Sequence, residues 1–309
     1  MADKIKSAYL APEGFTEPLL NELEGVISVH DQLILSSQPS KNAFWAQNIW
    51  REPQTLHIES INDAAKKLKA IHRNWFLYSY QLHRRAKLIL SKLPLVKSNP
   101  MIFPSSSSQA PLGTFTLLDE NTLLAGADCS NPFPNGEAHF VEDRNGPPNR
   151  AYLKLYEALT LAGSKPQSGD FCIDVGGSPG GWAWVIHQCG ADVLSFDRSE
   201  LDDSISQLKG VTFKKQDAFS LLPNDFSEEG RKVDWLFSDL ICYPEKLYEW
   251  ILKWVDSGIC KNFICTIKFK GKPDLAIINK FAAIPGSHVR HLFHNKNELT
   301  WFRLTQPAG

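Results

Sequence analysis

The chain has 309 residues, 43% of them hydrophobic, and a formal net charge of −1. This length allows two domains with a core each, and the composition excludes a disordered chain or an integral membrane protein. No apolar run is long enough to cross a bilayer, and no apolar stretch follows the charged N-terminus, so we expect neither a signal peptide nor a membrane partner. The six cysteines form no CxxC pair, which indicates reduced thiols in a cytoplasmic protein rather than disulfides or metal ligands.

The first hundred residues predict a small α/β unit. Hydrophobic alternation predicts two strands, over residues 6–10 and 26–36. Helical spacing predicts three helices, over residues 16–25, 60–71 and 81–93. Thr16 is the expected N-cap of the first helix, and Ser60 or Asp63 that of the second.

Basic residues are concentrated in one part of this unit. Residues 61–100, which we call the basic block, hold nine lysines and arginines against one acid, so the block carries a charge of +8. Such a block can bind the phosphates of a nucleic acid, and it can equally be a solvated helix face. The nearby aromatic residues Trp45, Trp50, Trp75 and Phe76 could stack on bases or pack in the core.

Two polar breaks follow. Residues 100–111 contain three prolines and four consecutive serines and predict a connector. Residues 114–118 and 122–125 flank Asp-Glu-Asn and predict a β-hairpin. A second proline-rich break over residues 143–149 divides the chain, so we expect an N-terminal α/β domain over residues 1–144 and a second domain over residues 145–309.

From Ala151 onward, strands alternate with helices, which is typical of a mostly parallel sheet covered on both faces. Trp250 and Trp254, four residues apart, are expected in the core of this domain. A short link between the last two strands predicts an antiparallel end, and seven strands with a closing hairpin are the outline of the Rossmann-like class I methyltransferase fold. The seven expected strands are residues 171–175, 192–196, 211–215, 233–238, 263–268, 289–293 and 299–304.

A glycine-rich segment follows the first of these strands and opens a helix. It reads Asp174-Val175-Gly176-Gly177-Ser178-Pro179-Gly180-Gly181-Trp182. Glycines let a backbone turn sharply and approach a ligand, and helix N-terminal amides favour a negative or polar group. The spacing differs from the G-x-G-x-x-G of dinucleotide sites, and the lysine of a P-loop is missing. An acid that leads such a loop suits the cationic amino-acid end of S-adenosylmethionine, and a glycine turn without a ligand is the alternative.

Two further acids stand where a nucleoside needs them. Asp197 ends the second strand, from where a carboxylate can accept hydrogen bonds from ribose hydroxyls. Asp217 follows the third strand and could accept from the adenine amino group. The candidate cofactor-binding residues are therefore Asp174, Gly176, Gly177, Ser178, Pro179, Gly180, Gly181, Trp182, Asp197 and Asp217, together with Asp239 after the fourth strand.

Together with the glycine loop, three short segments resemble FtsJ-type ribose 2′-O-methyltransferases: residues 149–155, 237–240 and 266–268. The resemblance extends over roughly residues 130–309 and is closest to the RlmM branch, bacterial enzymes that methylate a cytidine ribose in large-subunit ribosomal RNA. Residues 11–15 resemble the start of that branch's N-terminal domain. The resemblance implies S-adenosylmethionine as cofactor, ribosomal RNA as partner and a role in RNA recognition for residues 1–144. The branch has a larger RNA-recognition region between its domains than this chain has room for.

The family's functional set is lysine, aspartate, lysine and glutamate, and the resemblance carries it to Lys154, Asp239, Lys268 and Glu298. The chemistry also requires such groups, because a ribose hydroxyl is a poor nucleophile at neutral pH and needs positioning and a base. A lysine can be that base only if its pKa, ordinarily about 10.4, is depressed by burial or by a second cation. We expect Lys268 to be the base, Lys154 the second cation and Asp239 the group that holds the lysine and the methyl donor.

Two other functions stay open at this point. The chain could methylate a different hydroxyl or an amine, or it could be a non-catalytic RNA-binding protein on a methyltransferase fold. Retention of the loop and of all four residues favours the ribose methyltransferase. No metal is expected, because the histidines show no spacing typical of metal ligands: His139, His187, His288, His291 and His294.

Overall fold

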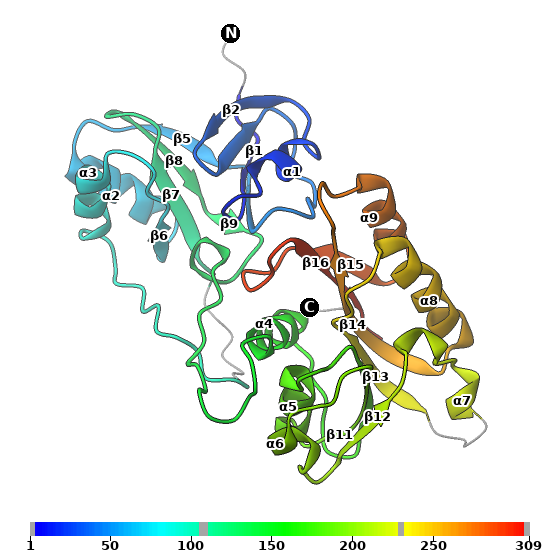
Figure 1. Cartoon of the computed structure of the whole chain (residues 1–309). Helices are drawn as coiled ribbons and strands as arrows, with labels where there is room; N and C mark the ends of the chain where they lie inside the picture. Colours follow the sequence, from blue (N-terminus) through cyan, green and yellow to red (C-terminus); the bar gives the residue numbers. More distant parts are fainter. Residues whose placement is uncertain (1–3, 105–110, 228–231, 306–309) are drawn as a thin grey trace. The chain divides into compact units, whose positions relative to one another are not determined.

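Two units make up the chain in the computed structural model (Figure 1). The first unit comprises Met1–Met101 and Ser106–His139, and the second comprises Ile102–Ser105 and Phe140–Gly309. The structure describes residues 4–104, 111–227 and 232–305, so the serines of the predicted connector lie outside the described residues. The functional division between residues 144 and 145 stays a prediction.

The first unit contains an antiparallel sheet in the order β2-β3-β1-β4-β9. The strands are β1 (Ser7–Leu10), β2 (Val26–His30), β3 (Leu33–Ser36), β4 (Asn48–Arg51) and β9 (Asp128–Cys129). The prediction of a single strand over residues 26–36 is wrong, because Asp31, with φ of 57°, turns the chain into a hairpin. Aspartate tolerates this left-handed conformation better than most residues do.

A short helix, α1 (Thr16–Leu20), follows the first strand. It ends earlier than the predicted range of residues 16–25, and Thr16 is its first helical residue instead of its cap. The side chain of the preceding Phe15 makes no capping hydrogen bond. A five-residue helix gains little from its own backbone hydrogen bonds, so its stability depends on packing, and Leu19 is the residue that it buries.

A second sheet of the first unit has the order β5-β8-β7-β6 and carries two helices. Ser60 caps the first helix as predicted, since its Oγ accepts a hydrogen bond from the backbone N of Asp63 at 3.1 Å. Leu68 and Ile89, one from each helix, pack with Trp75 in a shared core. The elements are β5 (Gln54–His57), α2 (Ile61–Ile71), β6 (Trp75–Leu77), α3 (His83–Leu90), β7 (Gly113–Leu117), β8 (Thr122–Gly126) and the turn η1 (Pro134–Gly136). The predicted hairpin is β7 and β8, which pair antiparallel.

The aromatic residues near the basic block are core residues. Trp45, Trp50 and Trp75 are at most 1% exposed, so the structure excludes them as a base-stacking surface, and only Phe76 is half-buried. Burial of a tryptophan removes a large apolar area from water, which stabilises the small unit. The lysines and arginines of the basic block are mostly exposed and stay available for a charged partner.

The second unit contains a seven-stranded sheet in the order β12-β11-β10-β13-β14-β16-β15. Its strands are β10 (Phe171–Val175), β11 (Asp192–Asp197), β12 (Val211–Lys215), β13 (Val233–Ser238), β14 (Cys260–Lys268), β15 (Ser287–Arg290) and β16 (Glu298–Arg303). The first five run parallel, and β16 lies antiparallel between β14 and β15. This topology confirms the predicted Rossmann-like class I methyltransferase fold.

Helices cover both faces of this sheet: α4, α5 and α6 lie on one side, and α8 and α9 on the other (Figure 1). Trp250 and Trp254, at 3% and 0% exposed, are in the core as predicted. The predicted strand over residues 289–293 is wrong in its end, because the chain leaves the sheet after Arg290. The remaining elements are α4 (Tyr152–Ala162), α5 (Gly181–Gln188), α6 (Asp203–Ser206), η2 (Ala218–Ser220), α7 (Asn224–Ser227), α8 (Pro244–Ser257) and α9 (Leu275–Ala282). Within the described residues, no helix is long and apolar enough to span a bilayer.

Candidate active site

The glycine loop connects β10 to α5 at the carboxyl end of the sheet. Gly176 and Gly180 have φ values of +75° and +117°, which side chains rarely adopt. A Cβ on Gly176 would stand 2.9 Å from Cδ2 of Leu240, and one on Gly180 would stand 2.8 Å from Cγ2 of Ile205. A Cβ on Gly177 would collide with the carboxylate of Asp174. The loop therefore requires glycine for both conformation and space.

Asp174 lies beneath the loop and is fully buried. Its Oδ2 accepts a hydrogen bond from Ser195 Oγ at 3.1 Å, whereas its Oδ1 has no partner among the described residues. Burial raises the pKa of this carboxyl to about 7, although the Ser195 hydroxyl opposes the rise. Asp174 is thus enclosed by its neighbours beside the loop, and its role at the cofactor stays a prediction.

The rest of the loop is tied to its surroundings. Ser178 donates from its Oγ to the Glu200 carbonyl at 2.8 Å, and the Pro179 carbonyl accepts from Asp202 N at 2.9 Å. A Cβ on Gly181 would collide with Asn149 Oδ1. Trp182, 2% exposed, donates from Nε1 to the Ala151 carbonyl at 3.0 Å. These contacts connect the loop to β11, to the segment before α6 and to the start of α4.

The two nucleoside acids differ in their surroundings. Asp197 Oδ2 accepts a hydrogen bond from Ser178 N at 3.0 Å, so the end of β11 is connected directly to the glycine loop. Asp217 Oδ2 is paired with Arg198 at 2.5 Å, and this contact is the main reason that the pKa of Asp217 is lowered. The structure therefore brings Asp197 to the loop, and no described contact connects Asp217 to it.

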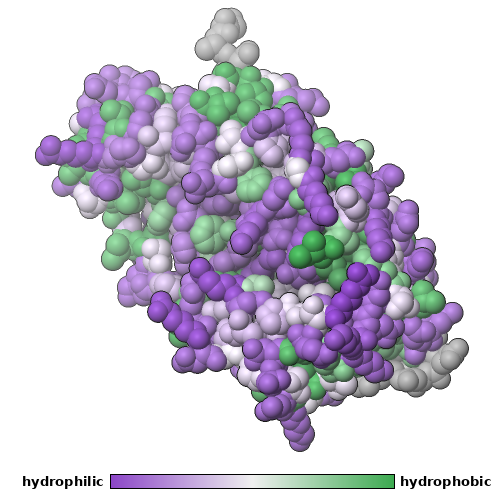
Figure 2. Space-filling model, in the orientation of Figure 1, coloured by the Kyte–Doolittle hydropathy of each residue, from purple (hydrophilic) through white to green (hydrophobic). Residues whose placement is uncertain are grey.

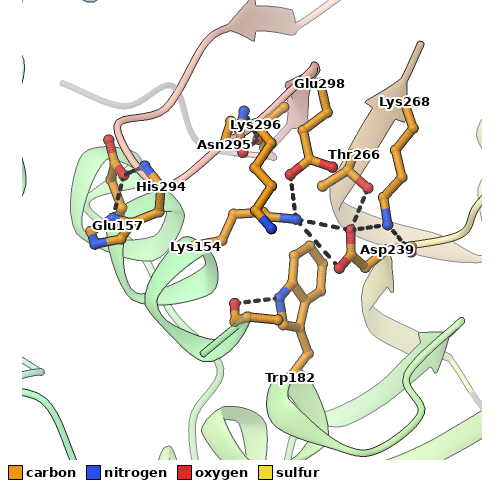
Figure 3. A network of polar contacts seen from close by, with 12 residues as sticks. Lys154, Glu157, Trp182, Asp239, Thr266, Lys268, His294, Asn295, Lys296 and Glu298 are labelled. Atoms are coloured by element: carbon orange, nitrogen blue, oxygen red, sulfur yellow. Dashed lines mark hydrogen bonds and ion pairs between the residues drawn. The ribbon is translucent and has the colours of Figure 1, made fainter. Parts of the chain in front are cut away.

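Four charged side chains form a connected network at the carboxyl ends of β13 and β14 (Figure 3). We call Lys154, Asp239, Lys268 and Glu298 the tetrad. Asp239 follows β13 directly, and Lys268 ends β14 opposite Glu298, the first residue of β16. Lys154 comes from the first turn of α4. Residues up to 144 positions apart in the chain therefore meet at one point.

Asp239 is the centre of the tetrad. Its Oδ1 contacts Lys154 Nζ at 3.1 Å and Lys268 Nζ at 2.9 Å, and accepts from Thr266 Oγ1 at 2.7 Å. Lys268 Nζ also donates to the Asp239 carbonyl at 2.7 Å. Lys154 Nζ contacts Glu298 Oε1 at 2.6 Å, and it lies 6.0 Å from the ring centre of Trp182 in the glycine loop. The network is thus complete and adjoins the loop.

The charged forms of Lys154 and Asp239 are favoured by their tetrad partners. Burial by itself would lower the pKa of Lys154, but the carboxylates of Asp239 and Glu298 outweigh it and raise the pKa. Burial would likewise raise the pKa of Asp239, and the ammonium groups of Lys154 and Lys268 instead lower it. Lys154 and Asp239 are therefore ionised at neutral pH in a buried position.

A second carboxylate on α4 holds the loop that precedes Glu298. Glu157 is fully buried and accepts from Phe293 N at 2.8 Å and from His294 N at 3.0 Å, and it contacts His294 Nδ1 at 2.8 Å (Figure 3). Lys154 and Glu157 are three residues apart and so share one face of the helix. The helix thereby contacts both the loop and Glu298.

Sequence reasoning assigned no role to Thr266 or Glu157, although both contact the site. The spacing carried a signal for each. Thr266 is two residues before Lys268 on a strand, so the two side chains share a face. Glu157 is one helical turn from Lys154. Neither spacing shows which distant segment the side chain meets, because that depends on the tertiary fold.

Comparison with known proteins gives a family and a set of relatives. Residues 147–280 match the family described as FtsJ-like methyltransferase. Ribosomal RNA large subunit methyltransferase M of Halorhodospira halophila is 26% identical over 190 residues, 59% of this chain and 54% of that protein. The protein of the same name from Methylococcus capsulatus is 27% identical over 273 residues, 83% of this chain and 72% of that protein.

The matched part of the chain spans about half the length of the Halorhodospira halophila protein and of two further relatives with the same name. Among solved structures, a putative ribosomal RNA methyltransferase from Plasmodium falciparum is 17% identical and covers 50% of this chain and 96% of that one. Its TM-score of 0.38 is too low to add to the argument.

Proposed function

We propose that this chain, in which residues 147–280 form an FtsJ-like methyltransferase domain, transfers a methyl group from S-adenosylmethionine to a ribose 2′-hydroxyl of RNA, with large-subunit ribosomal RNA as the substrate. The observation that carries the proposal is the tetrad, a set of two lysines and two acids joined by short polar contacts beside a glycine loop. A methyl transfer to a hydroxyl needs this combination of positioning and proton acceptance.

The loop suits S-adenosylmethionine because a glycine-rich turn led by an acid joins β10 to α5, and its glycines pack closely against Asp174, Leu240 and Ile205. Asp174 Oδ1, buried without a partner among the described residues, is a further polar acceptor beside the loop. We assign Asp197 to the ribose hydroxyls, Asp217 to the adenine amino group and Asp239 to the methyl donor. The remaining loop contacts come from Gly176, Gly177, Ser178, Pro179, Gly180, Gly181 and Trp182. A carboxylate oxygen accepts more than one hydrogen bond, so Asp197 can hold both the loop and a ribose.

When bound, S-adenosylmethionine supplies an activated methyl group, whose bond to sulfur breaks with the electron pair left on sulfur. Lys268 is the group that accepts the proton of the 2′-hydroxyl. Its side chain is 22% exposed against 8% for Lys154, so a substrate can reach it. Lys154, with its raised pKa, stays cationic. Both Nζ atoms contact Asp239 Oδ1, so they are no more than about 6 Å apart, and one carboxylate oxygen orients both side chains.

The other tetrad residues position these two groups. Asp239 holds both lysines through one oxygen, and Thr266 fixes that oxygen with a hydrogen bond. Glu298 holds Lys154 from the opposite side. Because these contacts exist before any substrate arrives, little reorganisation is needed when charge develops.

Residues 1–144 contribute RNA recognition in this proposal. The exposed lysines and arginines of the basic block on α2 and α3 are the groups that would contact phosphates. Such contacts add affinity and orientation without reading sequence.

Methylation of RNA by the purified full chain tests the proposal. The substrate is ribosomal RNA from cells without the gene, the donor is labelled S-adenosylmethionine, and the product is mapped for 2′-O-methyl positions. We expect one ribose to gain a methyl group that RNA from cells with the gene already carries. Cofactor binding without transfer to any RNA would point to a non-catalytic RNA-binding protein, and label on a base or another hydroxyl to a different methyltransferase.

A further inference from the structure

Two large apolar side chains are exposed directly after the tetrad aspartate. In the 240–243 segment, which joins β13 to α8, Ile241 is 82% exposed and Tyr243 is 62% exposed. Leu240 instead packs against the glycine loop at Gly176. Among the described residues of the second unit, no other large apolar side chain is as exposed as Ile241.

Exposed apolar residues are common singly on protein surfaces and need no explanation there. Figure 2 shows a face that is mostly hydrophilic, with hydrophobic side chains in small separate patches. Ile241 and Tyr243 differ from a chance exposure because they follow Asp239 by two and four residues. A pair of this kind beside reacting groups marks a surface that the substrate covers.

Lysines border the pair. Lys270 Nζ lies 5.2 Å from the ring centre of Tyr243. Burial raises the pKa of the intervening Cys242 thiol to about 11, and the ammonium groups of Lys246 and Lys268 oppose this rise, so both lie near the segment. The surface is therefore apolar with a cationic border.

Hydrogen bonds to Asn297 hold the backbone on both sides of Lys270. Asn297, next to Glu298, donates from Nδ2 to the carbonyls of Phe269 at 3.0 Å and Gly271 at 3.3 Å. Phe269 N in turn donates to the Asn297 carbonyl at 3.2 Å. The backbone around Lys270 is thus held against the strand that carries a tetrad residue, which makes the cationic border part of the same site.

We propose that Ile241 and Tyr243 form a stacking surface for unpaired bases of the RNA substrate, with Lys270 at the adjoining phosphates. This inference rests on the proposed function and narrows its substrate class. Every base has a flat π face, so aromatic and apolar side chains bind bases without regard to sequence. Those faces are accessible in loops and single strands and are covered in a duplex. The substrate is therefore an unpaired segment of RNA.

The chain distances agree with this placement. Ile241 follows Asp239 by two residues and Tyr243 follows it by four. Their Cα atoms therefore lie at most about 7 Å and about 14 Å from the Cα of Asp239. With the reacting hydroxyl at Lys268, Ile241 is within reach of the base of the same nucleotide, and Tyr243 of a neighbouring base. A protein or a lipid surface would meet the apolar pair equally well, but it would not bring a ribose to the tetrad.

Binding of a fluorescent single strand tests the stacking surface. The probe is a mixed-sequence oligoribonucleotide of roughly 15 nucleotides that carries 2-aminopurine, used alone and paired with its complement. We expect the full chain to bind the single strand more tightly than the duplex and to quench its fluorescence. The double variant Ile241→Ser with Tyr243→Ala should weaken single-strand binding about tenfold or more, because stacking on one side chain contributes that much.

Two further variants complete the experiment. Tyr243→Phe keeps the ring and should bind like the unaltered chain. Leu222→Ser removes an exposed apolar residue, 44% exposed, from a segment that carries no tetrad residue, and should also change nothing. Affinity for S-adenosylhomocysteine should be equal in all of them, which shows that the second unit is folded.

The outcomes separate this inference from the proposed function. If the unaltered chain methylates RNA, and the double variant binds both probes as tightly as the unaltered chain, the stacking surface is wrong and the proposed function stands. If the unaltered chain transfers no methyl group to RNA, the proposed function fails and the stacking surface fails with it.

Discussion

Two carboxyl groups, one in each unit, differ in how their surroundings shift the pKa. In the first unit, Glu22 accepts hydrogen bonds from Phe44 N at 2.7 Å and Trp45 N at 3.0 Å, and burial raises its pKa to about 7. In the second unit, Asp239 is also buried, but two ammonium groups lower its pKa. Burial alone therefore favours the neutral acid, and only a cation beside it keeps the charge.

The lysines show the same contrast. Those of the basic block in the first unit are mostly exposed, whereas Lys154 is buried in ion pairs at 3.1 and 2.6 Å. Exposed ion pairs are screened by water and contribute little, and buried ones act strongly on one another. The comparison indicates where chemistry is possible: charge by itself marks a binding surface, and buried charge with partners marks a reacting site.

The largest effect should come from the proposed base. Lys268→Ala should lower the rate of methyl transfer by roughly a hundred- to ten-thousand-fold while S-adenosylmethionine still binds. Lys268→Arg should not restore the rate, because a guanidinium does not give up its proton near neutral pH. Single-turnover kinetics on the mapped RNA measures both. Lys280→Ala, an exposed lysine on α9, is the control, and an arginine variant with near full turnover would refute the base role.

Loss of the cofactor should follow from a side chain in the glycine loop. Gly177→Val would collide with Asp174 and stand close to Ser195 Oγ, so affinity for S-adenosylmethionine should fall about a hundredfold or more, as calorimetry would show. Gly190→Ala is the control for a loss of stability without a collision, since a φ of +86° strains any side chain there while its Cβ meets nothing closer than 3.7 Å, and its cofactor affinity should stay the same. Equal cofactor affinity in Gly177→Val would remove the loop from the binding site.

Removal of the central charge tests the comparison most directly. Asp239→Asn leaves two buried lysines short of one carboxylate, which should cost about 3 kcal/mol in the free energy of unfolding, measured by urea denaturation. Asp234→Asn is the control, because Asp234 on β13 pairs with the half-exposed Lys261 at 2.6 Å and should cost about 1 kcal/mol or less. Similar losses in both variants would mean that the tetrad is no more coupled than a surface pair.

The basic block should affect RNA affinity alone. Replacement of Arg84, Arg85 and Lys87 by glutamate should weaken RNA binding about tenfold at low salt and flatten its salt dependence, while cofactor affinity stays the same. The control makes the same change of net charge in the second unit by replacing the exposed residues Lys209, Lys253 and Lys280. Equal RNA affinity in the block variant and the unaltered chain would identify the block as a solvated surface.

The smallest effect should be a change in the pH dependence of thermal stability when Glu22 is replaced. Because the pKa of Glu22 is raised from 4.5 to about 7, the stability it contributes is present below pH 4.5 and is lost as the pH rises through about 7. Thermal unfolding temperatures of Glu22→Gln should therefore fall less over this range than those of the unaltered chain. Part of the fall should remain, since Asp174 titrates in the same window. Glu13→Gln, an exposed acid, should follow the unaltered chain.

The sequence by itself determined the strands of the second unit and the loop between them. Long apolar runs such as Phe171–Val175 bury both faces of a strand, and this pattern is visible without a structure. Local chemistry also sufficed for the cap at Ser60. Short strands with polar residues, such as Gln54–His57, were missed because their partners lie far away in the chain. The hairpin at Asp31 was missed because hydrophobic alternation continues through its turn.

Only the tertiary structure decided the electrostatics of the candidate site. The four tetrad residues could be named by resemblance, but no periodicity shows that Lys154 meets Glu298 or that one oxygen of Asp239 holds two lysines. Exposure also depends on the tertiary structure. The indole rings of Trp50 and Trp75 could stack on bases, but both side chains are buried in the core. The reason is physical: exposure and charge coupling depend on which distant segments pack together, and a local sequence pattern does not contain that information.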